Sequence, residues 1–347
     1  MTPLPDLLKI AKSRAASDVL VMVGDAPAMR VAGEWTRFDH PRCTIEDLEK
    51  ATREMLRPEA WEELKQKREL DFSCTFGKTG RVRCNAHFQR DHLSLVLRLV
   101  WPSIPDPSQL GIPSHVIQSG ELQHGLVLVS GPTGSGKSTT LAAIVEHINK
   151  RRPAHVITIE DPIEFIYSNA KAIIEQREIG SDTVSWHSAL RTVLRQAPDV
   201  IVLGELRDLE SISIALGAAE TGHLVMASVH SATAAGAVSR LVDVFPPAQA
   251  PQIRLQLSQT LRMVFAQRLV PGRVRETRTL LYEILVNTPA VANLIRVGEL
   301  EQIPNAISAG RNYGMISFTQ CQCEMMVRGI LGAEGTSPGL VQNGAVA

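Results

Sequence analysis

The chain has 347 residues, which is enough for two domains with separate hydrophobic cores. Lys and Arg together number 36, as do Asp and Glu, so no net charge draws the protein to nucleic acid or to anionic lipid. No apolar run reaches the roughly 18 residues of a membrane span, and the N-terminus lacks the layout of a signal peptide. We therefore expect a cytoplasmic protein.

Residues 1–100 predict a small α+β domain. Helices are expected over 6–14 and, as one long charged helix with Thr44 as its N-cap, over 45–66. The strand-like runs cover 19–23, 29–31, 70–76, 81–89 and 93–99.

A proline-rich segment follows this first domain. Residues 101–107 contain three prolines, which exclude a helix and favour an extended chain. We assign residues 101–111 to a linker between two domains.

Residues 112–330 alternate strand patterns with helix patterns, which predicts a mainly parallel sheet with helices on both faces. Strands are expected at 126–129, 155–159, 200–203 and 224–229, and helices at 138–150, 185–195, 208–219 and 233–243. From about residue 248 onward helices are expected to dominate. The segment 331–347 is rich in Gly, Ala and Ser, and we expect a disordered tail.

A complete phosphate-binding loop lies between the first of these strands and its helix. Its pattern, G-x-x-x-x-G-K-[ST], lets backbone N–H groups surround a triphosphate, because glycine permits the close approach. Lys137 is expected to reach the β- and γ-phosphates, and Ser138 to hold Mg²⁺. The expected ATP-binding residues are Gly131, Pro132, Thr133, Gly134, Ser135, Gly136, Lys137, Ser138 and Thr139.

Hydrolysis also needs a group that orients or deprotonates water. Glu205 ends an apolar strand and is the best candidate for the base, because ligands bind at the carboxyl edge of such sheets. In a Walker B motif such a strand usually ends in Asp-Glu, and here Gly204 stands in place of the Asp. Mg²⁺ therefore relies either on Ser138 and water or on a further acid. Glu160, at the end of the 155–159 strand, is the candidate for that acid; the alternative is a helix cap or a solvated loop residue.

Histidines and arginines complete the candidate site. His223 and His230 bracket the 224–229 strand, where a histidine either contacts the γ-phosphate or the attacking water or has only a structural role. Arg83 and Arg98 lie on adjacent predicted strands of the first domain. They either stabilise the charge of the transferred phosphoryl group or are ordinary surface charges.

Several motifs together resemble the type II/type IV secretion ATPases, and within them the PilT-type pilus retraction motors. The resemblance runs from about residue 6 to 328. It rests on stretches at 16–18 and 81–85, an aspartate box at 158–165, a Walker B region at 196–208, and a histidine box from Ala219 to His230.

This resemblance implies a RecA-like P-loop core with a PAS-like N-terminal domain, assembled as a homo-hexameric ring that hydrolyses ATP with Mg²⁺. It implies work at the cytoplasmic base of a type IV pilus machine, on an inner-membrane platform protein, in pilus retraction and twitching motility. It also implies Glu205 as the base, Glu160 as a supporting acid, and Arg83 and Arg98 as phosphate contacts.

Three alternatives stay open. Ala292 and Val297 stand where the retraction signature has Arg and Glu. This departure concerns the pulling activity and not ATP binding, so one alternative is an accessory retraction ATPase. A pilus-assembly or type II secretion ATPase usually carries a four-cysteine metal element, whereas the five cysteines here include no C-x-x-C pair. A RecA-like DNA motor would need a basic, aromatic-lined groove, and only 4% of the residues are aromatic.

Overall fold

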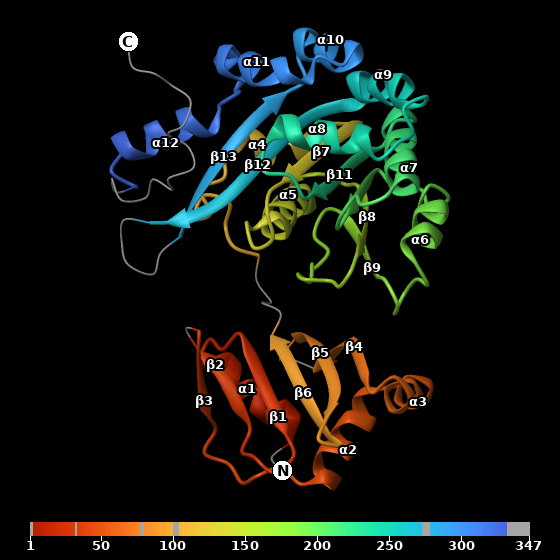
Figure 1. The fold of residues 1–347 in the computed structure, drawn as a ribbon, viewed down its shortest axis with the longest axis vertical. Coiled ribbons are helices and arrows are strands. Elements are labelled where there is room, and N and C mark those ends of the chain that lie inside the picture. Colours follow the sequence, from red (N-terminus) through yellow and green to blue (C-terminus); the bar gives the residue numbers. More distant parts are fainter. Residues whose placement is uncertain (1–2, 32, 77–79, 100–103, 273–277, 332–347) are drawn as a thin grey trace. The chain divides into compact units, whose positions relative to one another are not determined.

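The computed structural model describes residues 3–31, 33–76, 80–99, 104–272 and 278–331. The chain divides into two compact units, an N-terminal unit formed mainly by residues before 104 and a C-terminal unit formed by most residues from 104 onward (Figure 1). Within the described ranges no helix is long and apolar enough to cross a bilayer. Part of the linker expected at 101–111, and the tail expected after Leu331, lie outside the described residues.

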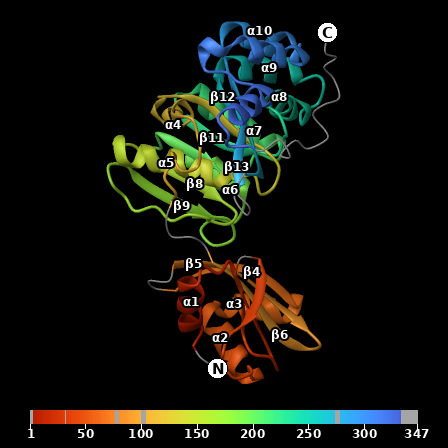
Figure 2. The same ribbon diagram turned by 90° about the vertical axis from the view of Figure 1, so that its left-hand side faces the viewer.

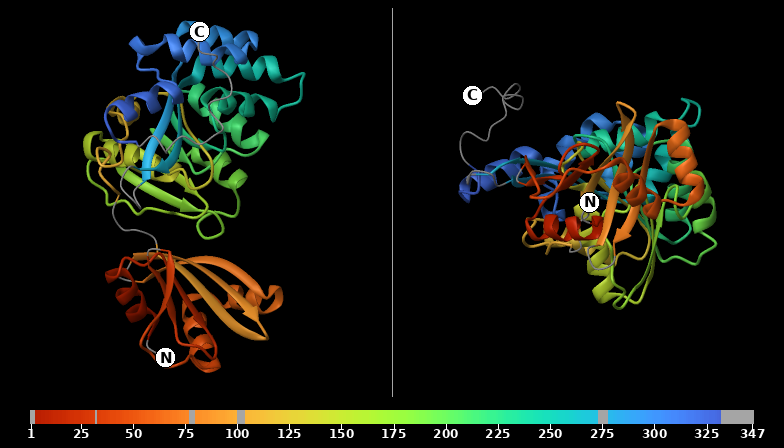
Figure 3. Two further views of the ribbon diagram at one scale, coloured as in Figure 1. Left: turned by 60° about the vertical axis from the view of Figure 1, so that its left-hand side comes forward. Right: turned by 90° about the horizontal axis from the view of Figure 1, so that it is seen from below.

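The N-terminal unit contains an antiparallel sheet in the order β3-β2-β1-β6-β5-β4. Alternate residues of its strands pack with the helices in one core, so the helices cover one face of the sheet (Figure 3). The strands are β1 (Asp18–Met22), β2 (Ala28–Val31), β3 (Glu34–Arg37), β4 (Glu69–Phe76), β5 (Gly80–Gln89) and β6 (His92–Leu99). The helices are α1 (Leu4–Ser13), α2 (Ile45–Met55) and α3 (Pro58–Lys67).

The single helix predicted over 45–66 is wrong, because two helices occupy that range. Thr44 and Asp47 form the expected capping box at the start of α2. Leu56 then leaves the helical region with ψ of 148°, and Pro58 occupies the first turn of α3. Proline has no N–H to donate and disfavours a helical residue before it, so it starts a new helix there.

The C-terminal unit contains a sheet of seven strands in the order β13-β12-β7-β11-β10-β8-β9 (Figures 1 and 2). All neighbouring pairs are parallel except β12 and β13. The strands are β7 (Gly125–Ser130), β8 (His155–Glu160), β9 (Ile173–Glu178), β10 (Val200–Leu203), β11 (Leu224–Val229), β12 (Leu261–Pro271) and β13 (Arg278–Val286). The predicted parallel sheet is confirmed.

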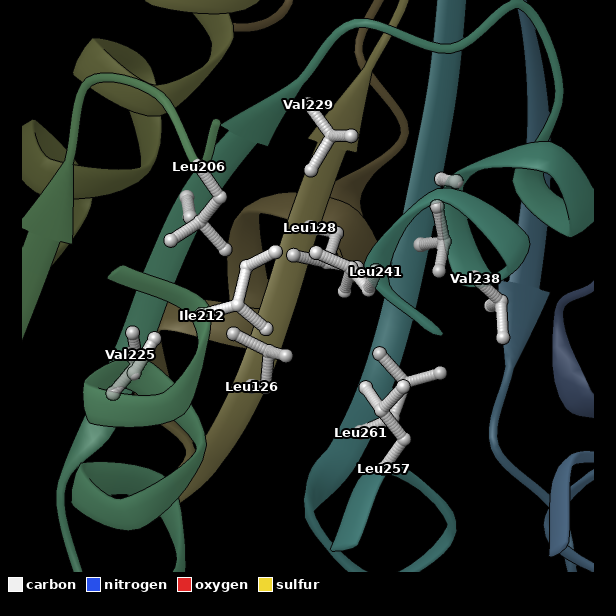
Figure 4. Packing of buried hydrophobic residues seen from close by; sticks show 14 of the residues in the cluster. Leu126, Leu128, Leu206, Ile212, Val225, Val229, Val238, Leu241, Leu257 and Leu261 are labelled. Atoms are coloured by element: carbon white, nitrogen blue, oxygen red, sulfur yellow. The ribbon is translucent and has the colours of Figure 1, made fainter. Parts of the chain in front are cut away.

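Helices lie on both faces of this sheet, as predicted. They are α4 (Ser114–Gln118), α5 (Lys137–Arg151), α6 (Trp186–Val193), α7 (Leu209–Glu220), α8 (Ala234–Asp243), α9 (Ala250–Thr260), α10 (Pro289–Val297), α11 (Ile303–Ala309) and α12 (Phe318–Val327). On one face, residues of α4 and α5 pack on the sheet. On the other, Ile212 of α7 and Leu241 of α8 pack near Leu126 and Leu128 of β7 (Figure 4).

The expectation that helices dominate after residue 248 is wrong between 261 and 286, where β12 and β13 pair as antiparallel strands. Five consecutive residues of β12, Met263 to Gln267, are buried, so the strand lacks the alternation that marks a half-exposed strand. Edge strands β3 and β9 were not predicted either. All four residues of β3 are exposed, which leaves no apolar pattern to read.

Candidate nucleotide-binding site

The loop after β7 has backbone geometry that requires glycine. Gly134 and Gly136 have φ angles of +77° and +90°, in the left-handed region that side chains disfavour. A Cβ atom on Gly131 would lie 2.3 Å from the carbonyl oxygen of Gln267 and 2.5 Å from Oγ of Ser135. The three glycines therefore allow a tight loop of main-chain groups between a buried strand and a helix N-terminus, an arrangement that binds phosphate.

Lys137 begins α5 and folds back over the start of the loop. Its Nζ donates hydrogen bonds to the carbonyl oxygens of Gly131 and Pro132, over 2.9 and 3.0 Å. The residue is 8% exposed. Helix α5 has Gly136 at its N-cap and receives no side-chain cap there, so the positive end of the helix and the lysine ammonium act on the same loop. Ser138 and Thr139 follow in the first turn and are half-buried.

Gln267 of β12 supports this loop, and sequence reasoning did not find it. Its Nε2 donates to the carbonyl oxygen of Ser135 over 2.7 Å, and its Oε1 accepts from Oγ1 of Thr140 over 2.7 Å. The side chain is 1% exposed. A buried amide with both ends hydrogen-bonded has one defined orientation, so Gln267 fixes the loop to the neighbouring strand. It lies within an apolar run assigned to helices, so no local signal marked it.

The sheet order places the sequence-predicted acids on the same edge as the loop. Strand β11 lies between β7 and β10, and β8 follows β10. With strands about 4.8 Å apart, the end of β10 lies about 10 Å from the end of β7, and the end of β8 about 14 Å. Glu205 follows β10 and Glu160 ends β8. Glu205 is therefore the better placed of the two to act on a phosphate held by the loop.

Glu160 is held by hydrogen bonds from its own sheet. Its Oε1 accepts from Oγ1 of Thr158 over 2.6 Å and from Nε2 of Gln176 on β9 over 3.2 Å. Burial raises the pKa of the nearby Tyr167 phenol well above its ordinary value, and the negative charges of Glu160 and Glu146 raise that pKa further. Tyr167 consequently stays neutral beside the carboxylate at physiological pH.

Glu205 has both carboxylate oxygens engaged. Arg207 donates from Nε to Oε2 over 2.7 Å, and Nε2 of His230 lies 3.3 Å from Oε1. The Glu205 side chain is 13% exposed, whereas that of Arg207 is 63% exposed. The acid is thus oriented by one group from its own loop and one from the end of β11. Beside it an open groove of about 510 Å³ is lined by residues including Arg207, His230, Ser231, Ser239 and Arg240.

The packing around position 204 accounts in part for a glycine where the Walker B motif usually has aspartate. A Cβ atom there would lie 3.3 Å from Cη2 of Trp186 and 3.4 Å from the carbonyl oxygen of Ile159. A side chain at this position would therefore crowd the Trp186 ring and β8. The backbone of Gly204 is also fixed on both sides, since its N–H donates to Ile159 and its carbonyl accepts from Oγ of Ser228.

The oxygen donors at this edge suit Mg²⁺. Ser138 offers a hydroxyl in the first turn of α5, and Glu160 and Glu205 offer carboxylates. Among the described residues, no group of three or more His, Cys, Asp or Glu side chains could hold a metal. Mg²⁺ usually keeps several waters and binds through one or two protein oxygens together with substrate phosphates, so this sparse set fits a nucleotide-borne ion.

Only one of the two histidines lies at the phosphate edge. His230 follows the carboxyl end of β11, whereas His223 precedes its amino end. Nδ1 of His223 lies 3.1 Å from the carbonyl oxygen of Ala218 and 3.3 Å from Oγ1 of Thr221, so the ring contacts the last turn of α7. In this chain His223 therefore lies at the opposite edge of the sheet from the loop, and its contacts are with α7.

Arg83 and Arg98 lie directly opposite each other on β5 and β6 of the N-terminal unit. Nε of Arg98 donates to Oδ1 of Asp18 over 2.9 Å, and its side chain is 64% exposed. Arg83 is exposed and has no hydrogen-bond or ion-pair partner among the described residues. The pair thus presents two guanidinium groups side by side on one sheet face.

Comparisons with known proteins agree along almost the whole chain. A family model, Type II/IV secretion system protein, matches residues 113–306. The chain is 42% identical to the uncharacterized protein YggR of Escherichia coli K12, over 91% of this chain and 96% of that one. It is 36% identical to the type IV pilus retraction ATPase PilT of Pseudomonas aeruginosa, over 95% and 96%. A crystal structure of the pilus retraction motor PilT with bound ADP superposes with a TM-score of 0.91 at 38% identity, covering 98% of both chains.

Proposed function

The chain belongs to the type II/IV secretion system protein family, and on that premise we propose that it is an ATPase motor of a type IV pilus machine that drives pilus retraction. The observation that carries the proposal is the end-to-end likeness to PilT, in sequence and in structure. Both units are matched, not the P-loop region alone. The RecA-like core and the small N-terminal domain are therefore shared with a retraction motor.

The proposed chemistry is hydrolysis of ATP at the edge of the parallel sheet. The amides of residues 131–136 and the N-terminus of α5 bind the phosphates, with the ammonium of Lys137 against the β- and γ-groups. Ser138 would hold Mg²⁺ together with the nucleotide, and the ion would supply positive charge against the phosphates. Water is oriented by Glu205, whose carboxylate is itself oriented by His230 and Arg207.

Glu160, Arg83 and Arg98 have supporting roles in this proposal. Glu160 carries negative charge on the same edge and would supplement Ser138 in holding Mg²⁺. Arg83 and Arg98 contact the phosphates and stabilise the charge of the transferred phosphoryl group. Their exposure and side-by-side placement support this role, since a guanidinium with free donors recognises phosphate well.

We extend the proposal to assembly and location. The motor is a homo-hexamer on the cytoplasmic side of the inner membrane, acts on a platform protein of the pilus machine, and binds no nucleic acid. Residues 1–100 and 112–330 form its two domains, joined by the linker at 101–111.

The alternative is a pilus-assembly or type II secretion ATPase. The five cysteines do not form a C-x-x-C pair, and Cys321 and Cys323 lie on one helix with only Cys321 buried. The two departures from the retraction signature both lie on α10, where Val297 is 52% exposed. An altered exposed face affects contacts with a partner more than it affects ATP binding.

A gene deletion tests the direction of work. Loss of a retraction motor should leave pili on the surface and abolish twitching, whereas loss of an assembly motor should remove the pili. A strain with normal pilus number and normal twitching would contradict both roles. Complementation with Lys137→Ala is the matched control, because a motor without ATP hydrolysis should not restore movement.

A further inference from the structure

One row of side chains crosses the N-terminal sheet on the face opposite its helices. The strand registers place Trp35 opposite Arg30, Arg30 opposite Asp18, Asp18 opposite Arg98, and Arg98 opposite Arg83. Directly opposed residues point to the same face of a sheet. The row therefore holds one tryptophan, three arginines and one acid, and the acid is the middle of the five.

Asp18 is the buried member of this row. Its side chain is 6% exposed, whereas that of Arg98 is 64% exposed. Oδ1 of Asp18 accepts from Nε of Arg98 over 2.9 Å, and Oδ2 accepts from Oγ of Ser17 over 2.8 Å. A buried carboxylate needs such partners, because an unpaired charge in the interior is costly. Asp18 is therefore an ordered anchor, and the arginine extends from it into solvent.

The way Asp18 holds Arg98 leaves the phosphate-binding part of the arginine available. A guanidinium has five N–H donors, and Asp18 takes the one on Nε. Among the described residues, the two Nη groups of Arg98 have no hydrogen-bond partner. These are donors that can form two parallel hydrogen bonds to a phosphate.

Asp18 forms its ion pair with Arg98 and not with its other basic neighbour, Arg30. Arg30 lies opposite Asp18 on the other side, but its Nε donates to the carbonyl oxygen of Gly33 over 3.0 Å. The guanidinium of Arg30 lies 6.0 Å from the centre of the Trp35 ring. Arg98 is thus the arginine of this row that is held by a buried charge.

We propose that Asp18 is a positioning residue that fixes the guanidinium of Arg98 and so presents its Nη donors for binding phosphate. This inference rests on the proposed phosphate contact of Arg98. Arginine side chains are long and flexible. Holding Nε at a fixed point removes much of the side chain's conformational freedom before phosphate binds. Since misplacing a catalytic group by about 1 Å can cost on the order of a hundredfold in rate, losing the anchor should reduce turnover although Asp18 itself contacts no phosphate.

A double-mutant cycle tests this proposal in the full-length protein. Asp18→Ala, Arg98→Ala and the double variant are compared for kcat and KM of Mg-ATP hydrolysis and for thermal stability. We expect Asp18→Ala to lower kcat by about tenfold or more, with a smaller change in KM. The double variant should be no slower than Arg98→Ala alone, because both substitutions remove the same interaction. Asp18→Asn, which keeps a neutral acceptor, should lie between the native protein and Asp18→Ala.

The matched control is a second carboxylate–arginine pair of the same unit. Arg37 donates from Nη2 to Oδ2 of Asp25 over 2.8 Å, and its side chain is 68% exposed. Asp25→Ala should leave turnover unchanged.

The possible outcomes separate the two proposals. If Arg98→Ala keeps native kcat, the phosphate contact itself is wrong. If Arg98→Ala is slow but Asp18→Ala is not, or if the two losses multiply in the double variant, the positioning role is overturned. Should Asp18→Ala fail to fold, Asp18→Asn decides, and native kcat in a folded Asn variant would overturn the role.

Discussion

Nε2 of His230 lies 3.3 Å from Oε1 of Glu205, and the two residues come from the ends of neighbouring strands β11 and β10. The histidine therefore contacts the proposed catalytic base. Together with Arg207 it gives the Glu205 carboxylate one orientation at the loop edge of the sheet.

Replacing Glu205 should separate binding from hydrolysis. Glu205→Ala should bind Mg-ATP with native affinity, because the phosphates are held by the loop and α5, yet hydrolyse it at least about tenfold more slowly. Nucleotide affinity by calorimetry and phosphate release measure the two steps. Glu210→Ala is a suitable control, since that acid lies on α7 and pairs with Arg191 of α6 over 2.7 Å. Native turnover in Glu205→Ala would transfer the role of base to another residue.

Removing the charge of Lys137 should abolish turnover. Its ammonium already lies 2.9 Å from the loop carbonyl of Gly131, so Lys137→Ala takes the positive charge from the place where the phosphates bind. Phosphate release in Mg-ATP measures the effect. Lys150 lies on the same helix, pairs with Glu146 over 3.0 Å and is 68% exposed, so Lys150→Ala should behave as the native protein. Unchanged phosphate release in Lys137→Ala would remove the site assignment.

Gln267→Ala should loosen the phosphate-binding loop. The substitution leaves the carbonyl of Ser135 and the hydroxyl of Thr140 without their partner, and each unsatisfied buried group costs about 1–3 kcal/mol. We expect a lower melting temperature and a higher KM for ATP. Gln256→Ala, at a surface glutamine that donates to Glu220 over 2.9 Å, should change neither value. Equal KM in the two variants would argue against a role for Gln267 in the loop.

Glu283 should make stability depend on pH. Burial raises its pKa above the ordinary 4.5, although hydrogen bonds from the backbone of Ala234 and Phe318 lower it. The folded state thus binds a proton more tightly than the unfolded state. The stabilisation that Glu283 contributes is fully present below pH 4.5 and is lost as pH rises through the folded-state pKa.

Glu283→Gln is the comparison that isolates this effect, because glutamine does not titrate. The free energy of unfolding of the native protein, relative to Glu283→Gln, should fall as pH increases from about 4.5 toward neutrality. Urea denaturation of both proteins across that range measures the difference. A difference that stays constant or grows with pH would show that the pKa is not raised.

Sequence patterns predicted much of this fold because many of its signals are local. The predicted strand at 224–229 matches β11, and those at 126–129 and 155–159 match β7 and β8 within one residue at each end. Each is a short apolar run bounded by turn residues. The prediction of one helix over 45–66 was wrong because it overlooked a local signal, Pro58. Strand β12 was missed because a strand buried on both faces and a buried helix have similar composition.

By itself the sequence determined the phosphate-binding loop, since eight consecutive residues that follow an apolar strand specify a turn that needs glycine and the N-terminus of a helix. It also placed Glu160 and Glu205 at strand ends. Only the tertiary structure decided which residues distant in sequence contact the loop and the proposed site residues. Gln267 is 132 positions from Ser135 of the loop, with which it forms a hydrogen bond, and Asp18 is 80 positions from Arg98. The reason is physical. Local sequence sets backbone conformation, but strand order and register decide which side chains meet, and these depend on packing of the whole chain.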